Sequence, residues 1–98
     1  MKNIIVTCFF VLMQLGILVH AQTNTTTDIY LKSQDGYACF RIPAIVKSKA
    51  GTLLAFAEAR KNSCSDTDNI DLVVKRSEDG GKTWSRIITV WDDGDNVC

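Results

Sequence analysis

Residues 77–84 read SEDGGKTW, and this stretch decides the fold. It matches the Asp-box pattern Ser-x-Asp-x-Gly-x-Thr-Trp at every defined position, through Ser77, Asp79, Gly81, Thr83 and Trp84. Asp79 can accept hydrogen bonds from backbone N–H groups of its own turn, and Gly81 can adopt a positive φ angle at no steric cost. Trp84 can bury its ring between strands. The box predicts a structural turn between two strands. Its acidic residues lack the ligand spacing of a calcium loop, so we predict no metal site.

Short segments with alternating or β-branched residues surround the box, and turn residues separate them. The predicted strands are residues 42–46, 52–58, 70–77 and about 83–91. Four short strands joined by tight turns predict an all-β, antiparallel meander. In the second strand, Leu53 and Ala55 share one face while Leu54 and Phe56 share the other, so both faces are apolar. Such a sheet needs neighbours on both sides, as one four-stranded blade of a β-propeller does.

Residues 1–21 have the features of a secretory signal peptide. Lys2 gives a positive start, an apolar run extends from residue 4 to residue 19, and the segment ends in the small-residue pattern VHA. We predict cleavage after Ala21 and a secreted or periplasmic protein. An N-terminal membrane anchor is the alternative, but the run is short for a span and no basic cluster follows it. We expect no membrane span after the signal, and residues 22–36 are predicted to be a polar leader with a lead-in strand.

The charge balance limits the classes of partner that the protein can bind, and the cysteine content bears on its cellular compartment. The 11 basic and 11 acidic side chains cancel, so the sequence offers no electrostatic footprint for nucleic acid. Once Cys8 leaves with the signal, the odd set Cys39, Cys64 and Cys98 remains, and its pairing is open. The odd count, together with a cysteine at the last position, leads us to expect that the chain is the front part of a longer protein.

The stretch FRIP, residues 40–43, places a permanent cation at the start of the first predicted strand. Pro43 favours an extended conformation at Ile42 and so constrains the orientation of Arg41. Taken alone, Arg41 would most simply be a surface residue in a salt bridge. However, FRIP followed by LLAFAEAR and then by CSDTDNIDLVVKRSEDGGKTW resembles the sialidase (neuraminidase) family, glycoside hydrolase family 33. The resemblance extends from about residue 37 to the end of the chain.

The resemblance implies a six-bladed β-propeller, of which residues 37–98 are the first blade. It implies an exo-sialidase that hydrolyses terminal α-linked sialic acids of glycoconjugates with retention of configuration, without metal or organic cofactor. The expected partners are sialylated glycans. The tyrosine–glutamate nucleophile pair and two further arginines of such enzymes lie downstream in family members, and Tyr30 and Tyr37 come too early to match. The chain is therefore expected to be a fragment and inactive alone.

The resemblance also implies roles for individual residues. Arg41 matches the first of three arginines that hold the sialic acid carboxylate, and Arg60 matches an arginine near the C4 region of the sugar, although a solvated strand-end charge is the simpler alternative. Asp66 matches the general acid/base, with Asp68 as the competitor in the same loop. In an up-and-down meander, the start of the first strand and the loop between the second and third strands share one end. Arg41, Arg60 and Asp66 should therefore converge there, with the Asp box at the opposite end.

Two other functions stay open at this point. A trans-sialidase differs only in whether water or a sugar hydroxyl accepts the sialyl group. A non-catalytic Asp-box propeller that acts as a binding module would lack the downstream tyrosine and arginines.

Overall fold

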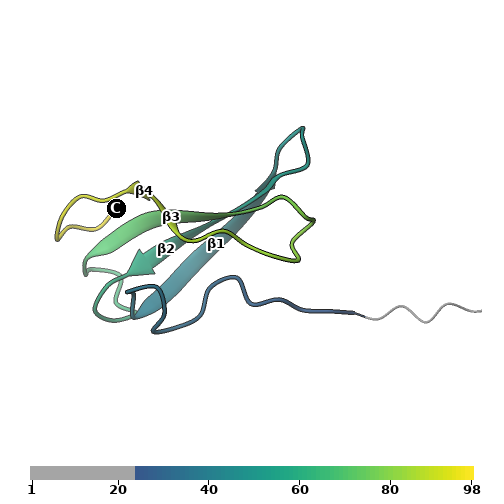
Figure 1. The fold of residues 1–98 in the computed structure, drawn as a ribbon. Coiled ribbons are helices and arrows are strands. Elements are labelled where there is room, and N and C mark those ends of the chain that lie inside the picture. The colour runs from purple at the N-terminus through teal and green to yellow at the C-terminus, as the bar shows by residue number, and fades with distance from the viewer. Residues whose placement is uncertain (1–23) are drawn as a thin grey trace, which may run out of the picture.

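The computed structural model describes residues 24–98, so the predicted signal peptide lies outside the described part of the chain. The described residues form one open sheet whose strands lie in the order β1-β2-β3-β4 (Figure 1). The strands are β1 (Cys39–Lys47), β2 (Leu53–Arg60), β3 (Ile70–Ser77) and β4 (Ile88–Trp91). Each strand pairs antiparallel with the next. The fold is therefore all-β, and one open four-stranded antiparallel meander is the architecture of a single propeller blade.

The strand bounds differ from the sequence prediction mainly at β4. The third strand has the predicted bounds, β1 begins three residues earlier than expected at Cys39, and β2 continues to Arg60. The start of the fourth strand at about residue 83 is wrong, because β4 begins at Ile88. The residues just before β4 are linked to β3 by isolated hydrogen bonds. One of these is donated by the Ser85 N–H to the Arg76 carbonyl at 2.8 Å. The Asp-box turn thus extends further into the chain than its residue types indicate.

A β-bulge interrupts β1 at Ile42 and Pro43. Arg41 pairs with Glu58 and Ala44 pairs with Phe56, so two residues of β1 face one residue of β2. Proline fits here because it lacks the N–H that regular pairing would use. The expectation of an extended Ile42 is wrong, since its φ angle is +53°. The extra residue of the bulge overrides the local preference imposed by Pro43, and it lets Arg41 and Ala44 point to the same face despite their odd spacing.

One face of the sheet is covered by the chain's own lead-in segment, which passes across it before entering β1 (Figure 1). The small residues Ala57 and Ala59, with Val73, form the buried centre of this face. Aromatic side chains pack on them, and the Tyr30 hydroxyl donates a hydrogen bond of 2.7 Å to the Ala55 carbonyl. Alanine leaves the space that the rings occupy, so the lead-in and the sheet form one packed unit.

Apolar side chains remain exposed on the outer strands. Ile45 is 58% and Val46 52% exposed on β1, while Trp91 is 61% exposed on β4. Isolated exposed hydrophobic residues are ordinary, but here several large ones lie on both outer strands of one small sheet. The sheet therefore has more apolar surface than its own chain covers.

Candidate active site

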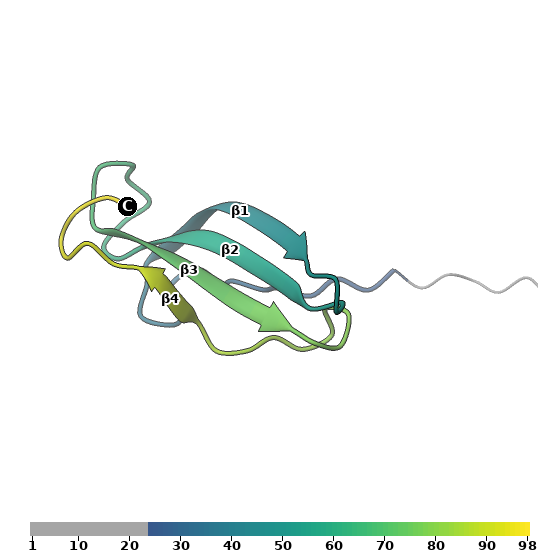
Figure 2. The same ribbon diagram turned by 90° about the horizontal axis from the view of Figure 1, so that it is seen from above.

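The predicted site residues meet at one end of the sheet. Arg41 lies near the start of β1, Arg60 is the last residue of β2, and Asp66 lies in the loop of residues 61–69 that follows. Seen from above, this loop and the C-terminal segment occupy one end of the sheet, and the β1–β2 and β3–β4 connections occupy the other (Figure 2). The convergence predicted from the meander topology is thus present in the structure.

Asp66 lies between the two arginines. Its Oδ1 is 3.3 Å from Nη1 of Arg41, and the same oxygen accepts a short hydrogen bond from Nη1 of Arg60. The hydrogen bond from Arg60, the charge of Arg60 and then the charge of Arg41 hold the pKa of Asp66 below its usual range. The carboxyl group is therefore ionised at neutral pH in this arrangement. The two guanidinium groups therefore oppose protonation of Asp66 as long as both of them contact it.

Asp68, the competing acid, has different surroundings. Its Oδ1 accepts hydrogen bonds from the Asn69 N–H at 2.7 Å and from Nδ2 of Asn62 at 3.1 Å. The bond from the Asn69 backbone is the largest cause that lowers the pKa of Asp68. These contacts belong to the loop itself and stabilise its turn. The structure brings Asp66 to the arginines and places Asp68 in the internal bonding of the loop.

A disulfide fixes the loop that carries Asp66. Cys39, at the start of β1, is bonded to Cys64, with a Cα–Cα distance of 5.3 Å. Cys98 is a free, exposed cysteine. The sequence leaves the pairing of these three cysteines open, and the structure resolves it because Cys39 pairs with Arg60 across the β1–β2 ladder, four residues before Cys64. The bond ties the loop to the strand that carries Arg41.

Arg60 is buried, with 2% of its surface exposed, and its terminal nitrogens are engaged. Nη1 donates to the Cys64 carbonyl at 2.8 Å as well as to Asp66, and Nη2 donates to Oε2 of Glu58 at 2.7 Å. These bonds to Asp66 and Glu58 raise the pKa of Arg60. The structure therefore does not support a solvated strand-end charge, and it places the Arg60 guanidinium inside the blade beside the site.

Glu58 is the site residue that sequence reasoning missed. It lies two positions before Arg60, so the two side chains share one face of β2, and it pairs with Arg41 across the ladder. The sequence shows the spacing of Glu58 and Arg60 on one face of β2, and the β1–β2 register adds Arg41 opposite Glu58. It could have been found by combining the alternation of β2 with the register of β1.

The two tyrosines of the chain are structural. The Tyr37 hydroxyl donates to Oδ2 of Asp71 at 2.7 Å, and burial is the main cause that raises the pKa of both Tyr30 and Tyr37 to about 12. A phenol that resists ionisation is a poor nucleophile. Both rings pack on the face that the lead-in covers, away from the contact between Arg60 and Asp66. In this structure both tyrosines pack and form hydrogen bonds between the lead-in and the sheet.

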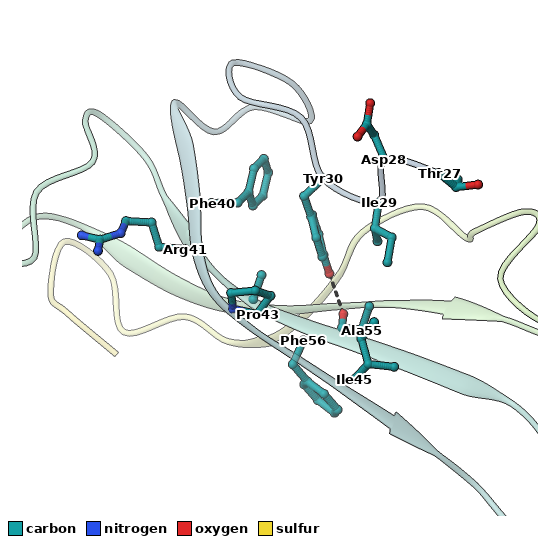
Figure 3. Close-up of a pocket in the computed structure, with 11 residues that line it drawn as sticks. Thr27, Asp28, Ile29, Tyr30, Phe40, Arg41, Pro43, Ile45, Ala55 and Phe56 are labelled. Atoms are coloured by element: carbon teal, nitrogen blue, oxygen red, sulfur yellow. Dashed lines mark hydrogen bonds between the residues drawn. The ribbon is translucent and has the colours of Figure 1, made fainter. Parts of the chain in front are cut away.

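A hollow of about 310 Å³ lies between the lead-in and strands β1 and β2. Figure 3 shows Tyr30 and Ile29 on its outer side and Pro43 and Ile45 on β1, with Arg41 extending away at one end. The lining is mainly apolar, and the polar bond inside it is the one from Tyr30 to Ala55. The hollow is therefore a gap under the lead-in segment, and the charged cluster lies beyond it.

The turn at the opposite end is held by its own side chains. Oδ1 of Asp79 accepts hydrogen bonds from the Ser77 hydroxyl at 2.8 Å and from the Thr83 N–H at 2.9 Å. The Gly81 N–H donates to the Ser77 hydroxyl at 2.8 Å, and Nε1 of Trp84 donates to the Gly81 carbonyl at 3.2 Å. Gly81 has a φ angle of +91°. The Trp84 ring is only partly buried, so it covers the turn without being enclosed between strands.

The fold and the charged cluster define a class: an all-β blade with a structural turn at one end and an arginine–carboxylate site at the other. The chain is 44% identical over 54 residues to a sialidase of Bacteroides fragilis, a match that covers 54% of this chain and 10% of that protein. It is 46% identical over 55 residues to an exo-alpha-sialidase of Arthroderma benhamiae, covering 56% of this chain and 14% of that protein. A sialidase of Paraclostridium sordellii is 42% identical over 68 residues, covering 62% of this chain and 17% of that protein.

Over these 54 to 68 matched residues the chain is therefore similar to parts of sialidases. The chain spans between 10% and 17% of the length of the three relatives. No family model matches it. Within residues 24–98, no helix has the length and apolar character needed to cross a membrane.

Proposed function

We propose that residues 37–98 form the first blade of a six-bladed exo-sialidase that releases terminal α-linked sialic acids from glycoconjugates. The observation that carries this proposal is the contact of Asp66 with both Arg41 and Arg60 at the loop end of the blade. Sialic acid carries a carboxylate, and its glycosidic oxygen must be protonated to leave. A cluster that combines an exposed guanidinium with an exposed carboxyl group has the chemistry for both tasks.

In this proposal Arg41 binds the carboxylate of the sugar. Its side chain is 48% exposed, and its guanidinium already contacts a carboxylate, that of Asp66. A guanidinium fork binds a carboxylate through paired, charge-assisted hydrogen bonds. A substrate carboxylate would compete with Asp66 for Arg41 and would leave Asp66 with fewer bonds to its ionised form.

Asp66 is the proposed general acid/base. It would protonate the leaving glycosidic oxygen and then accept a proton from the attacking water, which gives retention through a covalent intermediate in a two-step reaction. The nucleophile is assigned to no residue of this chain. The proposed role of Arg60 is to support the C4 region of the sugar, although only 3% of its side chain is exposed in this structure. The proposed reaction requires neither a metal nor an organic cofactor.

We also propose that the chain is exported through the signal peptide predicted at residues 1–21 and is secreted or periplasmic. The disulfide between Cys39 and Cys64 supports this, because structural disulfides persist in oxidising compartments. Export with cleavage after Ala21 is tested by the N-terminal sequence of the secreted protein, which should begin at Gln22.

The test of the function is an assay of the complete protein that contains this blade, with natural sialosides and with a fluorogenic aryl sialoside. We expect release of sialic acid, and proton NMR of the first product should show the α-anomer, as retention requires. Release of the β-anomer first would contradict retention. Transfer of the sialyl group to lactose in preference to water would indicate a trans-sialidase, and glycan binding without turnover would indicate a non-catalytic propeller.

The isolated segment 22–98 should be inactive and prone to association. The exposed apolar side chains of β1 and β4, including Ile45 and Trp91, would be free to pair with other copies. Size-exclusion chromatography should show oligomers. A soluble monomer that turns over a fluorogenic sialoside would contradict this part of the proposal.

A further inference from the structure

The Arg60 guanidinium binds two carboxylates, those of Glu58 and Asp66. Only 3% of the Arg60 side chain is exposed, whereas 30% of the Glu58 side chain and 75% of the Asp66 side chain are exposed. A buried cation requires compensation by a partner that is itself held in place. Of the two acids, Glu58 lies on the regular backbone of β2, while Asp66 lies in a loop. Glu58 is therefore held by regular strand backbone, whereas the position of Asp66 depends on how its loop is anchored.

The geometry of the guanidinium separates the two roles. Nη2 donates to Glu58 at 2.7 Å, and Nη1 donates to the Cys64 carbonyl at 2.8 Å and to Asp66. Because a guanidinium is planar, fixing Nη2 also fixes the direction in which the hydrogens of Nη1 point. The contact with Glu58 thus determines where Arg60 holds the loop at Cys64 and Asp66.

We propose that Glu58 is a positioning residue that acts on Asp66 through Arg60. It holds the buried guanidinium so that the guanidinium anchors the loop of residues 61–69 and keeps the Asp66 carboxyl group beside Arg41. The inference rests on the proposed function in one respect, namely that Asp66 is the group that takes part in the reaction. In this role Glu58 would contact neither the substrate nor the reacting atoms.

Two simpler roles for Glu58 predict different behaviour. If Glu58 only neutralises a buried charge, its loss should lower the stability of the blade without a selective effect on Asp66. If Glu58 acts on Asp66 only through space, as one negative charge on another, its removal should lower the pKa of Asp66. If it positions Arg60, its removal should weaken the bond from Arg60 to Asp66 and raise that pKa toward its usual range.

The experiment compares Glu58→Ala and Glu58→Gln in the complete protein, with Glu78→Ala as the matched control. Glu78 also pairs with an arginine two positions away, since its Oε1 is 3.5 Å from Nη2 of Arg76, but at the other end of β3 and in an exposed position. The pKa of Asp66 is measured by NMR of protein labelled with carboxyl-¹³C aspartate, and the Asp66 signal is assigned by its loss in Asp66→Asn. This readout does not depend on turnover.

We expect Glu58→Ala to raise the pKa of Asp66, Glu58→Gln to restore it in part because the amide oxygen still accepts from Nη2, and Glu78→Ala to leave it unchanged. In the assay, kcat on natural sialosides should fall about 10- to 100-fold in Glu58→Ala, as misplacement of a reacting group does. It should fall less on an aryl sialoside, whose leaving group needs no proton. KM should change little.

An unchanged or lowered pKa of Asp66 in both Glu58 variants would overturn the inference, and Glu58→Gln keeps the test valid if Glu58→Ala fails to fold. A large rise in KM with unchanged kcat would instead make Glu58 a substrate contact. The proposed function fails separately, if the unmodified protein does not release sialic acid. In that case the NMR measurement still decides whether Glu58 positions Asp66.

Discussion

Nη1 of Arg41 lies 3.3 Å from Oδ1 of Asp66, although the two residues are 25 positions apart in the sequence. Arg41 is placed by the pairing of β1 with β2, and Asp66 by a loop that the Cys39–Cys64 disulfide ties to β1. Both side chains are well exposed, and an exposed ion pair contributes little to stability. The pair therefore contributes little to stability, and the Arg41 guanidinium, 48% of whose side chain is exposed, stays accessible to a ligand. A ligand carboxylate that binds Arg41 would necessarily compete with Asp66.

Loss of the Asp66 carboxyl group should reduce activity on natural sialosides much more than activity on aryl sialosides. In the complete protein, Asp66→Ala should lower kcat on natural sialosides by about 10²- to 10⁴-fold, the usual contribution of a general acid/base. The loss should be much smaller on an aryl sialoside, because its leaving group departs without protonation. Steady-state kinetics on the two substrates measure the difference.

Asp68→Ala is the matched control for that measurement, since Asp68 lies in the same loop but bonds to Asn62 and Asn69. It should lower activity equally on both substrates, through loosening of the loop. If Asp68→Ala shows the leaving-group dependence and Asp66→Ala does not, the assignment of the acid/base is wrong.

Binding of sialosides should be weakened even by a substitution of Arg41 that keeps the positive charge. Arg41→Lys replaces a planar fork with a single ammonium group, which cannot form paired hydrogen bonds with a carboxylate. Loss of one charge-assisted bond predicts a rise in KM of about 10- to 100-fold for sialosides. Arg86→Lys, at an exposed position near the Asp-box turn, serves as the control. Equal KM values for Arg41→Lys and the unmodified protein would contradict a role in carboxylate binding.

The sequence predicted those parts of the fold that depend on local pattern. The third strand was predicted with the bounds of Ile70–Ser77, because apolar and β-branched residues recur there between clear turn residues. The bulge at Ile42 was not predictable, because the local rule for a residue before proline favours an extended conformation. The register of β1 against β2 decides that position, and register is a property of two strands together.

The same distinction applies to the site. The meander topology predicted that Arg41 and Asp66 lie at one end, and the 3.3 Å contact confirms that they meet. The role of Glu58 and the pairing of Cys39 with Cys64 could not be predicted from strand periodicity alone. They depend on which residues face each other across the β1–β2 ladder and on the path of the loop. The roles of these residues in catalysis stay predictions.

The disulfide should contribute substantially to the stability of the blade. Cys39 and Cys64 are separated by 25 positions, and closing a loop of this length removes enough entropy from the unfolded chain to stabilise the fold by about 3 kcal/mol. We expect Cys39→Ser with Cys64→Ser to lower the free energy of unfolding by that amount, measured by urea denaturation of the complete protein. Activity should fall further than stability explains, because the loop with Asp66 loses its covalent link to β1.

The control for the disulfide is Cys98→Ser, because Cys98 is free and exposed. It should leave both the urea midpoint and the activity unchanged. If Cys98→Ser destabilises the protein as much as the double variant does, the pairing of Cys39 with Cys64 is not the one that forms in solution.

The lowered pKa of Asp79 predicts how the stability of the Asp-box turn depends on pH. Hydrogen bonds from the side chain and the backbone of Thr83, followed by one from Ser77, lower the pKa of Asp79 from 3.8 to about 2. Because the pKa in the folded state lies below that in the unfolded state, the carboxylate contributes stability above about pH 4. That contribution is lost as the pH falls through the interval down to about 2.

Asp79→Asn should therefore lower the thermal midpoint at pH 7, where the carboxylate accepts its full set of bonds, and the difference from the unmodified protein should vanish near pH 2. The neighbouring exposed acid Glu78 gives the comparison, since its bond to Arg76 is long at 3.5 Å and Glu78→Gln should change the midpoint little at any pH. Thermal unfolding of the three proteins between pH 2 and pH 7 measures the effect. A midpoint difference for Asp79→Asn that persists unchanged to pH 2 would show that the amide disrupts the turn by its shape, and that the charge of Asp79 is not what holds residues 77–84 together.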